Sequence, residues 1–131
     1  MKLVNRDTDY AIRAVCHIAE AKSIVLTTVD LSFSLKVPRP ILRKVLGKLR
    51  RAGILTSCKG KKGGFCLSRS AKEISVLDVL QAIQGPFSLA ECFLLKDPCP
   101  RRKVCRLKTR LNDIENGVRE KLRAISITSI L

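Results

Sequence analysis

Residues 38–67 read PRPILRKVLGKLRRAGILTSCKGKKGGFCL, a basic amphipathic segment followed by two short apolar runs around a glycine- and lysine-rich tip. Proline fits the first turn of a helix but not its interior, so Pro38 and Pro40 predict a helix that begins there. It runs to about Ala52 and is stopped by Gly53. Its apolar face comprises Ile41, Leu42, Val45, Leu46 and Leu49, and its basic face comprises Arg39, Arg43, Lys44, Lys48 and Arg51.

A short helix is expected directly before this segment. Thr27 and Asp30 have the spacing of a capping box, which predicts a helix that begins after Thr27 and ends near Leu35. A short helix, a tight turn and an amphipathic helix with a basic outer face are together typical of a helix-turn-helix.

The segment after the basic helix predicts a β-hairpin. The apolar runs 54–58 and 65–68 flank the tip 59–64, whose glycines supply positive φ. Lys59, Lys61 and Lys62 would lie where a wing meets a phosphate backbone. An ordinary solvated hairpin is the alternative, and a P-loop does not match the spacing. Because the hairpin follows a basic amphipathic helix, the wing is the favoured interpretation.

The positive charge is concentrated in the same part of the chain. The 131 residues carry a formal charge of +15, and residues 31–72 contain no Asp or Glu. A charge of this size on a small chain indicates a polyanionic partner, of which nucleic acid is the commonest. A merely basic surface is the alternative, although solvated surfaces normally interleave both signs. The absence of Trp argues against a single-strand binder that stacks bases on aromatic rings.

The sequence also suggests a compartment. It contains no apolar run long enough to cross a bilayer, and residues 1–7 lack the apolar core of a signal peptide. We therefore expect a cytoplasmic protein without a membrane partner. Thiols are kept reduced there, so the six cysteines are expected to serve burial, metal binding or redox chemistry rather than structural disulfides.

Two further helices flank this region. The first is predicted from about Thr8 to Ala21, with Asp7 as its N-cap, and with Ile12, Val15, Cys16 and Ala19 on one face. Ser75 and Asp78 form another capping-box pair that opens a helix ending at 85–86. Its apolar residues are Leu77, Leu80 and Ile83.

The C-terminal part carries a long apolar stripe. Its members recur at spacings of three and four residues over about 33 Å of helix, and they are Val104, Leu107, Leu111, Ile114, Val118, Leu122 and Ile125. The chain offers little surface to cover so long a stripe. A second copy in a homodimer is therefore expected to cover it, and packing on the chain's own helices is the alternative.

Three cysteines precede this stripe. Cys92, Cys99 and Cys105 are separated by six and five residues, without the CxxC pair of a zinc ribbon. Three thiolates on a proline-containing loop suit an iron–sulfur cluster. The basic neighbours of Cys105 would favour the thiolate form and offset the cluster's negative charge; they are Arg101, Arg102, Lys103 and Arg106.

The other candidate ligands are interpreted as structural. Cys16 lies on the expected core face of the first helix, and Cys58 and Cys66 lie in the wing strands, so all three are expected to pack as small apolar side chains. His17 is the only histidine, and a single helix histidine is more often structural than a ligand. One histidine and no nucleophile–base pair argue against an enzyme or a small-molecule substrate.

These features together resemble the IscR/NsrR family of bacterial winged-helix iron–sulfur regulators. The resemblance spans essentially the whole chain, and it rests on residues 9–13 (DYAIR), 38–44 (PRPILRK), 59–65 (KGKKGGF), the three late cysteines and 127–131 (ITSIL).

The resemblance implies a homodimer joined by the C-terminal helix. Two recognition helices in such a dimer would read a palindromic double-stranded DNA operator. It implies a 2Fe–2S or 4Fe–4S cluster held by Cys92, Cys99 and Cys105. Arg43 and Lys44 would face the major groove and Lys59 the minor groove. The full set of expected DNA contacts is Arg39, Pro40, Arg43, Lys44, Lys48, Lys59, Lys61 and Lys62.

Two positions depart from parts of the family. Lys108, a poor ligand, stands where some members have a histidine, and the cysteine spacing differs by one residue from some members, which leaves the cluster type open. Asp9 falls where others use a carboxylate from the partner subunit, so it is the candidate fourth ligand. A plain first-turn helix acid is the alternative for Asp9.

The expected fold is mostly α, a winged helix-turn-helix with a β-hairpin wing and a long C-terminal dimerisation helix. The predicted divisions are a DNA-binding domain over 1–85, a cluster loop over 86–105, and the dimerisation helix with a C-terminal tail over 103–131. The expected function is a transcriptional regulator whose operator affinity is switched by a cluster that senses iron–sulfur status, redox state or nitric oxide. A cluster-free regulator with switching disulfides among the late cysteines is one rival, and an electron-transfer protein is another.

Overall fold

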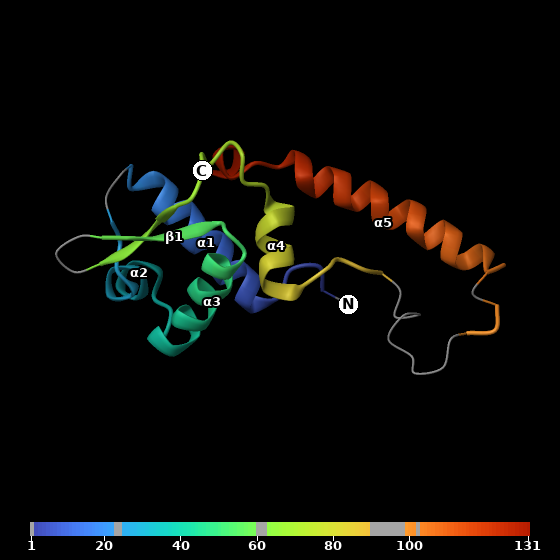
Figure 1. Ribbon diagram of the computed structural model, residues 1–131, viewed down its shortest axis with the longest axis horizontal. Coiled ribbons are helices and arrows are strands. Elements are labelled where there is room, and N and C mark those ends of the chain that lie inside the picture. Colours follow the sequence, from blue (N-terminus) through green and yellow to red (C-terminus); the bar gives the residue numbers. More distant parts are fainter. Residues whose placement is uncertain (1, 23–24, 60–62, 90–98, 102) are drawn as a thin grey trace.

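The computed structural model describes residues 2–22, 25–59, 63–89, 99–101 and 103–131. Five α-helices, a two-stranded antiparallel sheet and a 3-10 helix make up this part of the chain (Figure 1). In order they are α1 (Arg6–Glu20), α2 (Thr28–Leu35), α3 (Arg39–Arg51), β1 (Leu55–Cys58), β2 (Gly64–Leu67), α4 (Val76–Gln84), α5 (Arg106–Ala124) and η1 (Ile127–Ile130). This arrangement confirms the predicted winged helix-turn-helix with a long C-terminal helix.

The predicted capping boxes are present. The Thr27 backbone N–H donates to the Asp30 carboxylate at 2.9 Å, and the Asp30 N–H donates back to the Thr27 hydroxyl at 3.1 Å. Ser75 and Asp78 repeat the pattern at the start of α4. Helix α3 ends at Arg51, and Gly53, two residues beyond it, has a φ of 78°, which suits glycine.

The predicted start of α1 is wrong by two residues. Asn5, not Asp7, is the N-cap, and its side chain accepts a hydrogen bond from the Thr8 N–H at 2.8 Å. The cause lies outside the helix. The Gln84 side-chain oxygen on α4 accepts from the Asn5 N–H at 3.1 Å and from the hydroxyl of the buried Thr8 at 2.7 Å. These contacts fix Asn5 as the cap.

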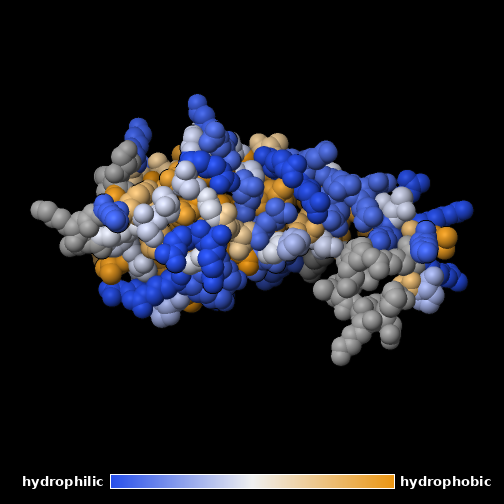
Figure 2. Space-filling view, viewed as in Figure 1, coloured by the Kyte–Doolittle hydropathy of each residue, from blue (hydrophilic) through white to orange (hydrophobic). Residues whose placement is uncertain are grey.

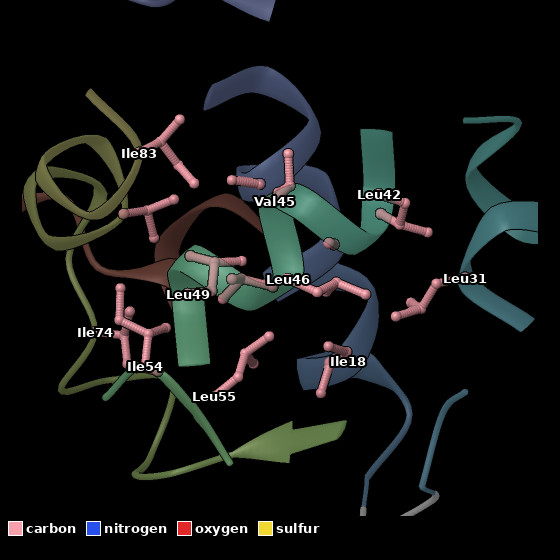
Figure 3. Packing of buried hydrophobic residues seen from close by; sticks show 14 of the residues in the cluster. Ile18, Leu31, Leu42, Val45, Leu46, Leu49, Ile54, Leu55, Ile74 and Ile83 are labelled. Atoms are coloured by element: carbon pink, nitrogen blue, oxygen red, sulfur yellow. The ribbon is translucent and has the colours of Figure 1, made fainter. Parts of the chain in front are cut away.

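A single apolar core joins α1–α4 (Figure 3). Helix α3 contributes its predicted apolar face, of which Leu42, Val45, Leu46 and Leu49 are fully buried and Ile41 is partly buried. On α1 the buried centre is rotated from the predicted face. It consists of Ala11, Ala14, Val15 and Ile18, while Ile12, Cys16 and Ala19 are partly buried at its edges.

The wing is a short hairpin in which Leu55 pairs with Leu67 and Cys58 with Gly64. Its second strand also pairs with the segment before α2, because Phe65 N–H donates to the Leu26 carbonyl at 2.9 Å. This bridge connects the wing to the first helix of the helix-turn-helix. Gly64 is required there, because a Cβ would lie 2.6 Å from the Leu26 carbonyl oxygen.

The prediction that Cys58 and Cys66 only pack is wrong, because they form a disulfide. The hairpin register explains it. Cys66 pairs with Thr56 and Cys58 with Gly64, so the two cysteines are diagonal neighbours on the hairpin, with their Cα atoms 6.1 Å apart. That separation lies within the range of disulfides.

Helix α5 packs along α4 and extends beyond the core (Figure 1). None of its residues is fully buried, and Val104, Leu107 and Ile114 of the predicted stripe are 77%, 68% and 56% exposed. The chain then returns to the core. Ile127 of η1 is completely buried, and its N–H donates to the Ile74 carbonyl at 2.8 Å.

Candidate nucleic-acid interface and cysteine site

The outer face of α3 is a basic surface. Arg39, Pro40 and Arg43 are exposed, and hydrophilic side chains gather over this part of the molecule (Figure 2). Among the described residues, no ion pair engages Arg39 or Arg43. A guanidinium group without a carboxylate partner is available for bidentate contact with guanine or phosphate.

Two lysines of the predicted interface contact the protein itself. The Lys44 ammonium lies 3.3 Å from the Asp7 carboxylate on α1, in a pair whose lysine side chain is 61% exposed. Such a surface pair contributes little energy and can be exchanged for a phosphate. The half-buried Lys48 donates to the Ile83 carbonyl on α4 at 3.1 Å. Lys48 therefore holds α3 against α4.

The wing continues the basic surface from α3. Arg50 at the end of α3 donates to the Ser57 hydroxyl on β1 at 3.5 Å, which connects the two elements. Sequence reasoning did not assign Arg50 a role, although it belongs to the acid-free run. Lys59 is exposed directly after β1. The other two predicted wing contacts, Lys61 and Lys62, lie outside the described residues.

The described part of the cysteine site lies at the start of α5. Cys105 is the N-cap of this helix and accepts a hydrogen bond from the Lys108 N–H at 3.4 Å. Cys99 is exposed, and both cysteines are free thiols. A helix N-terminus favours a negatively charged ligand such as a metal-bound thiolate. The donor chemistry of these two residues therefore fits an iron–sulfur cluster.

The third predicted thiol, Cys92, lies outside the described residues. Within the described ranges, no three His, Cys, Asp or Glu side chains form a metal-binding group. The predicted metal set of Cys92, Cys99, Cys105 and Asp9 therefore stays a prediction.

Asp9 lies in the first turn of α1 and pairs with Arg13 at 2.9 Å. Helix α1 packs against α3 and α4, while the first residues of α5 lie at the end of that helix that projects away from the other helices (Figure 1). The helix that carries Asp9 and the helix that Cys105 caps therefore begin in separate parts of the molecule (Figure 1).

Two other candidate ligands on α1 are partly buried. Cys16 packs against the apolar core, and burial, with a smaller contribution from Glu20, raises the pKa of its thiol. The thiol is therefore neutral, which suits packing better than metal binding. His17 is half-buried on the same helix.

The sequence profile of the Rrf2 family, described as iron-dependent transcriptional regulators, matches residues 4–131. The chain belongs to the Rrf2 family. This Rrf2 protein is 32% identical over 114 residues to the transcriptional regulator NsrR of Bacillus licheniformis, covering 86% of this chain and 79% of NsrR. The family confirms the resemblance predicted from the motifs, and it makes the protein a transcriptional regulator.

Solved structures that share its fold include two named regulators. CymR, the global cysteine regulator of B. subtilis, superposes with a TM-score of 0.76 and 21% identity, covering 99% of this chain and 96% of CymR. IscR of T. potens superposes with a TM-score of 0.75 and 21% identity, covering 99% of this chain and 85% of IscR.

In the part of this Rrf2 chain that the structure describes, no helix has the length and apolar character needed to cross a bilayer.

Proposed function

We propose that this Rrf2 protein is a cytoplasmic homodimer that binds a palindromic operator and whose affinity is set by an iron–sulfur cluster at Cys92, Cys99 and Cys105. The role is binding rather than catalysis, without a small-molecule substrate. The observation that supports the DNA part is the basic face of α3 beside the wing, on which Arg39 and Arg43 are exposed and make no ion pair with any described residue. Arg43 would read a base in the major groove, and Lys59 would contact a phosphate near the minor groove.

The second copy in this proposal covers the exposed stripe of α5. Leu107 and Ile114 are large apolar side chains that one chain leaves largely in water. A matching stripe on a second chain removes both from water at once, as in helix pairs of dimers. Two recognition helices related by the dimer axis would then enter major grooves about 34–36 Å apart.

The cluster would be held by the three late cysteines, with Asp9 of a partner subunit as the proposed fourth ligand. When bound, the group supplies a centre that reacts with oxidants and nitric oxide. Carboxylate oxygen is a harder ligand than thiolate, so a site completed by Asp9 would release its cluster readily. Lability of this kind suits a sensor.

Contacts of α5 with the segment after α4, and of α4 with α3, connect the helix that Cys105 caps to the DNA-binding face. Arg119 on α5 donates to the Phe87 carbonyl at 2.9 Å, and the Leu89 N–H donates to Glu115 at 3.1 Å. These bonds fix the segment that leaves α4. At the end of α4, the Ile83 carbonyl accepts from Lys48 of α3. Rearrangement near Cys105 would reach α3 through these contacts, with a coupling of about 1–3 kcal/mol typical of allosteric proteins.

A cluster-free mechanism is the second candidate. Cys99 and Cys105 are free thiols outside the apolar core, and Cys99 is exposed. A disulfide among the late cysteines would then replace the cluster as the switch.

One measurement separates the two candidates. Protein purified without oxygen from a strain competent in cluster assembly is assayed for iron, sulfide and visible absorption. Stoichiometric iron and sulfide with visible bands support the cluster, and their loss in Cys105→Ala with retained folding assigns the site. Colourless, iron-free protein would overturn the cluster and leave the thiol mechanism.

The DNA part has its own test. If a dimer neutralises about 6–10 phosphates, its affinity for duplex DNA falls roughly 10³–10⁵-fold between 50 and 200 mM salt. An affinity that does not change with salt would contradict the proposed phosphate contacts.

Sedimentation velocity tests the dimer. Leu107→Glu places a charge within the stripe and is expected to give a monomer, whereas Arg110→Glu, at an exposed polar position on the same helix, leaves the dimer intact. A dimeric Leu107→Glu protein would refute the assignment of α5.

A further inference from the structure

We propose that Cys58 and Cys66 form a second, cluster-independent redox site: a reversible disulfide in the wing whose formation strengthens duplex binding. This inference rests on the proposed DNA-binding function. Both cysteines lie in the wing strands. Neither is among the proposed cluster ligands. It is based on the disulfide between Cys58 and Cys66.

The position of the pair suits a switch. The disulfide closes a ring over 58–66 that encloses the tip, and Lys59, a proposed phosphate contact, directly follows Cys58. Neither cysteine is buried in the core, and Cys58 lines a hollow between the wing and the start of α2 together with Val29 and Phe65. Solutes can therefore reach the sulfur. In the cytoplasm a disulfide in such a place is usually transient and redox-sensing rather than structural.

The pair is also connected to the rest of the DNA-binding face. Phe65, next to Cys66, pairs with Leu26 immediately before the N-cap of α2. Ser57, next to Cys58, accepts a hydrogen bond from Arg50 of α3. A covalent bond between Cys58 and Cys66 therefore joins two strands that each contact one helix of the helix-turn-helix.

The oxidant in this proposal is a low-molecular-weight disulfide, RSSR. The Cys58 thiolate attacks one sulfur of RSSR, which forms a mixed disulfide and expels RS⁻. The Cys66 thiolate then attacks the Cys58 sulfur, which forms the wing disulfide and expels the second RS⁻. The two cysteines lose two protons and two electrons in total, and RSSR is reduced to two RSH. An excess of a dithiol reverses both steps.

The expected effect on binding follows from preorganisation. In the reduced protein no covalent bond joins the two strands at Cys58 and Cys66, so holding Lys59 in place on DNA costs conformational entropy and lowers the affinity. In the oxidised protein the disulfide has already reduced this cost. We expect the oxidised protein to bind duplex DNA about 3- to 10-fold more tightly than the reduced protein.

The test uses the full-length, metal-free protein. A labelled 30-base-pair duplex is first selected from a random pool by the wild-type protein. Its affinity is then measured by fluorescence anisotropy after treatment with oxidised glutathione or dithiothreitol, followed by removal of the reagent. Peptide mapping establishes whether Cys58 and Cys66 are linked. The variants are Cys58→Ser, Cys66→Ser and the double substitution, with folding checked by circular dichroism.

The proposal expects a linked 58–66 peptide, a tighter oxidised wild type, and a response lost equally in both single variants. Three results would overturn it: no linked peptide, a linked peptide without tighter binding, or a response that persists in the double variant and so belongs to the late cysteines. Failure of the proposed function looks different, because no duplex is then selected from the pool in either redox state.

Discussion

The ammonium group of Lys48 on α3 donates a hydrogen bond to the backbone carbonyl of Ile83 near the end of α4, at 3.1 Å. The last carbonyls of a helix have no partner within the helix, and a nearby lysine both satisfies one and complements the helix dipole. Lys48→Met keeps the aliphatic stem but removes this donor. We expect it to lower the free energy of unfolding by about 1 kcal/mol, measured by urea denaturation.

Lys44→Met is the matched control for that substitution. Its partner is a carboxylate in a largely exposed pair, so the expected change in stability is below about 0.5 kcal/mol. Equal stability of the Lys48→Met and wild-type proteins would show that the contact with Ile83 contributes nothing.

Arg43→Ala is expected to weaken operator binding with little effect on stability. The side chain is exposed, and loss of one bidentate contact with guanine costs about 1–3 kcal/mol, which is roughly 5- to 150-fold in affinity. Anisotropy titrations with the selected duplex and with single-base variants of it measure the effect. Lys72→Ala, on the loop between β2 and α4, is the control and should bind like wild type. If Arg43→Ala also does so, Arg43 does not read a base.

Asp9→Ala is expected to shorten the lifetime of the cluster while the metal-free protein still binds DNA. The reason is the loss of the proposed fourth ligand from the partner subunit. The decay of visible absorption in air is the measurement. Arg13→Ala serves as the control because it breaks the 2.9 Å ion pair and keeps the carboxylate. Identical decay in Asp9→Ala and wild type would assign Asp9 to the helix terminus alone.

Ile127→Ala is expected to lower the free energy of unfolding by about 2–5 kcal/mol, the usual cost of emptying a buried isoleucine site. Ile127 is completely buried, whereas Ile130 on the same turn is 43% exposed. Ile130→Ala should therefore change stability by less than about 1 kcal/mol. Equal free energies of unfolding for the two variants would contradict the packing of η1 in the core.

The features that were predicted correctly depend on interactions between residues close together in the sequence. The capping boxes at Thr27 and Ser75 depend only on residues three positions apart, and the buried face of α3 depends only on helical spacing. The N-cap of α1 was beyond such reasoning. Asn5 and Asp7 are equally suitable by type, and the choice between them is made by Gln84, which lies 79 residues from Asn5.

The wing disulfide was missed for a related reason. The expected reducing compartment argued against it, and the pairing of Cys58 with Cys66 follows from a register that only the folded hairpin reveals. The cysteine site could be proposed from spacing and resemblance. The proposed ligands include Cys92, which lies outside the described residues, and Asp9 of a second copy, so the described surroundings of Cys105 alone do not determine the site.

The burial of Ile127 also bears on how the protein is made. Helices α1–α4 are synthesised before α5, yet their shared core is complete only when Ile127 enters it. While the ribosome adds the 19 residues of α5, the earlier helices lack one of their fully buried side chains. The half that would bind DNA therefore reaches full stability only after the helix that would pair with a second subunit exists. In the proposed dimer, each new chain would therefore reach its full stability only when the helix that pairs with a second copy is also present.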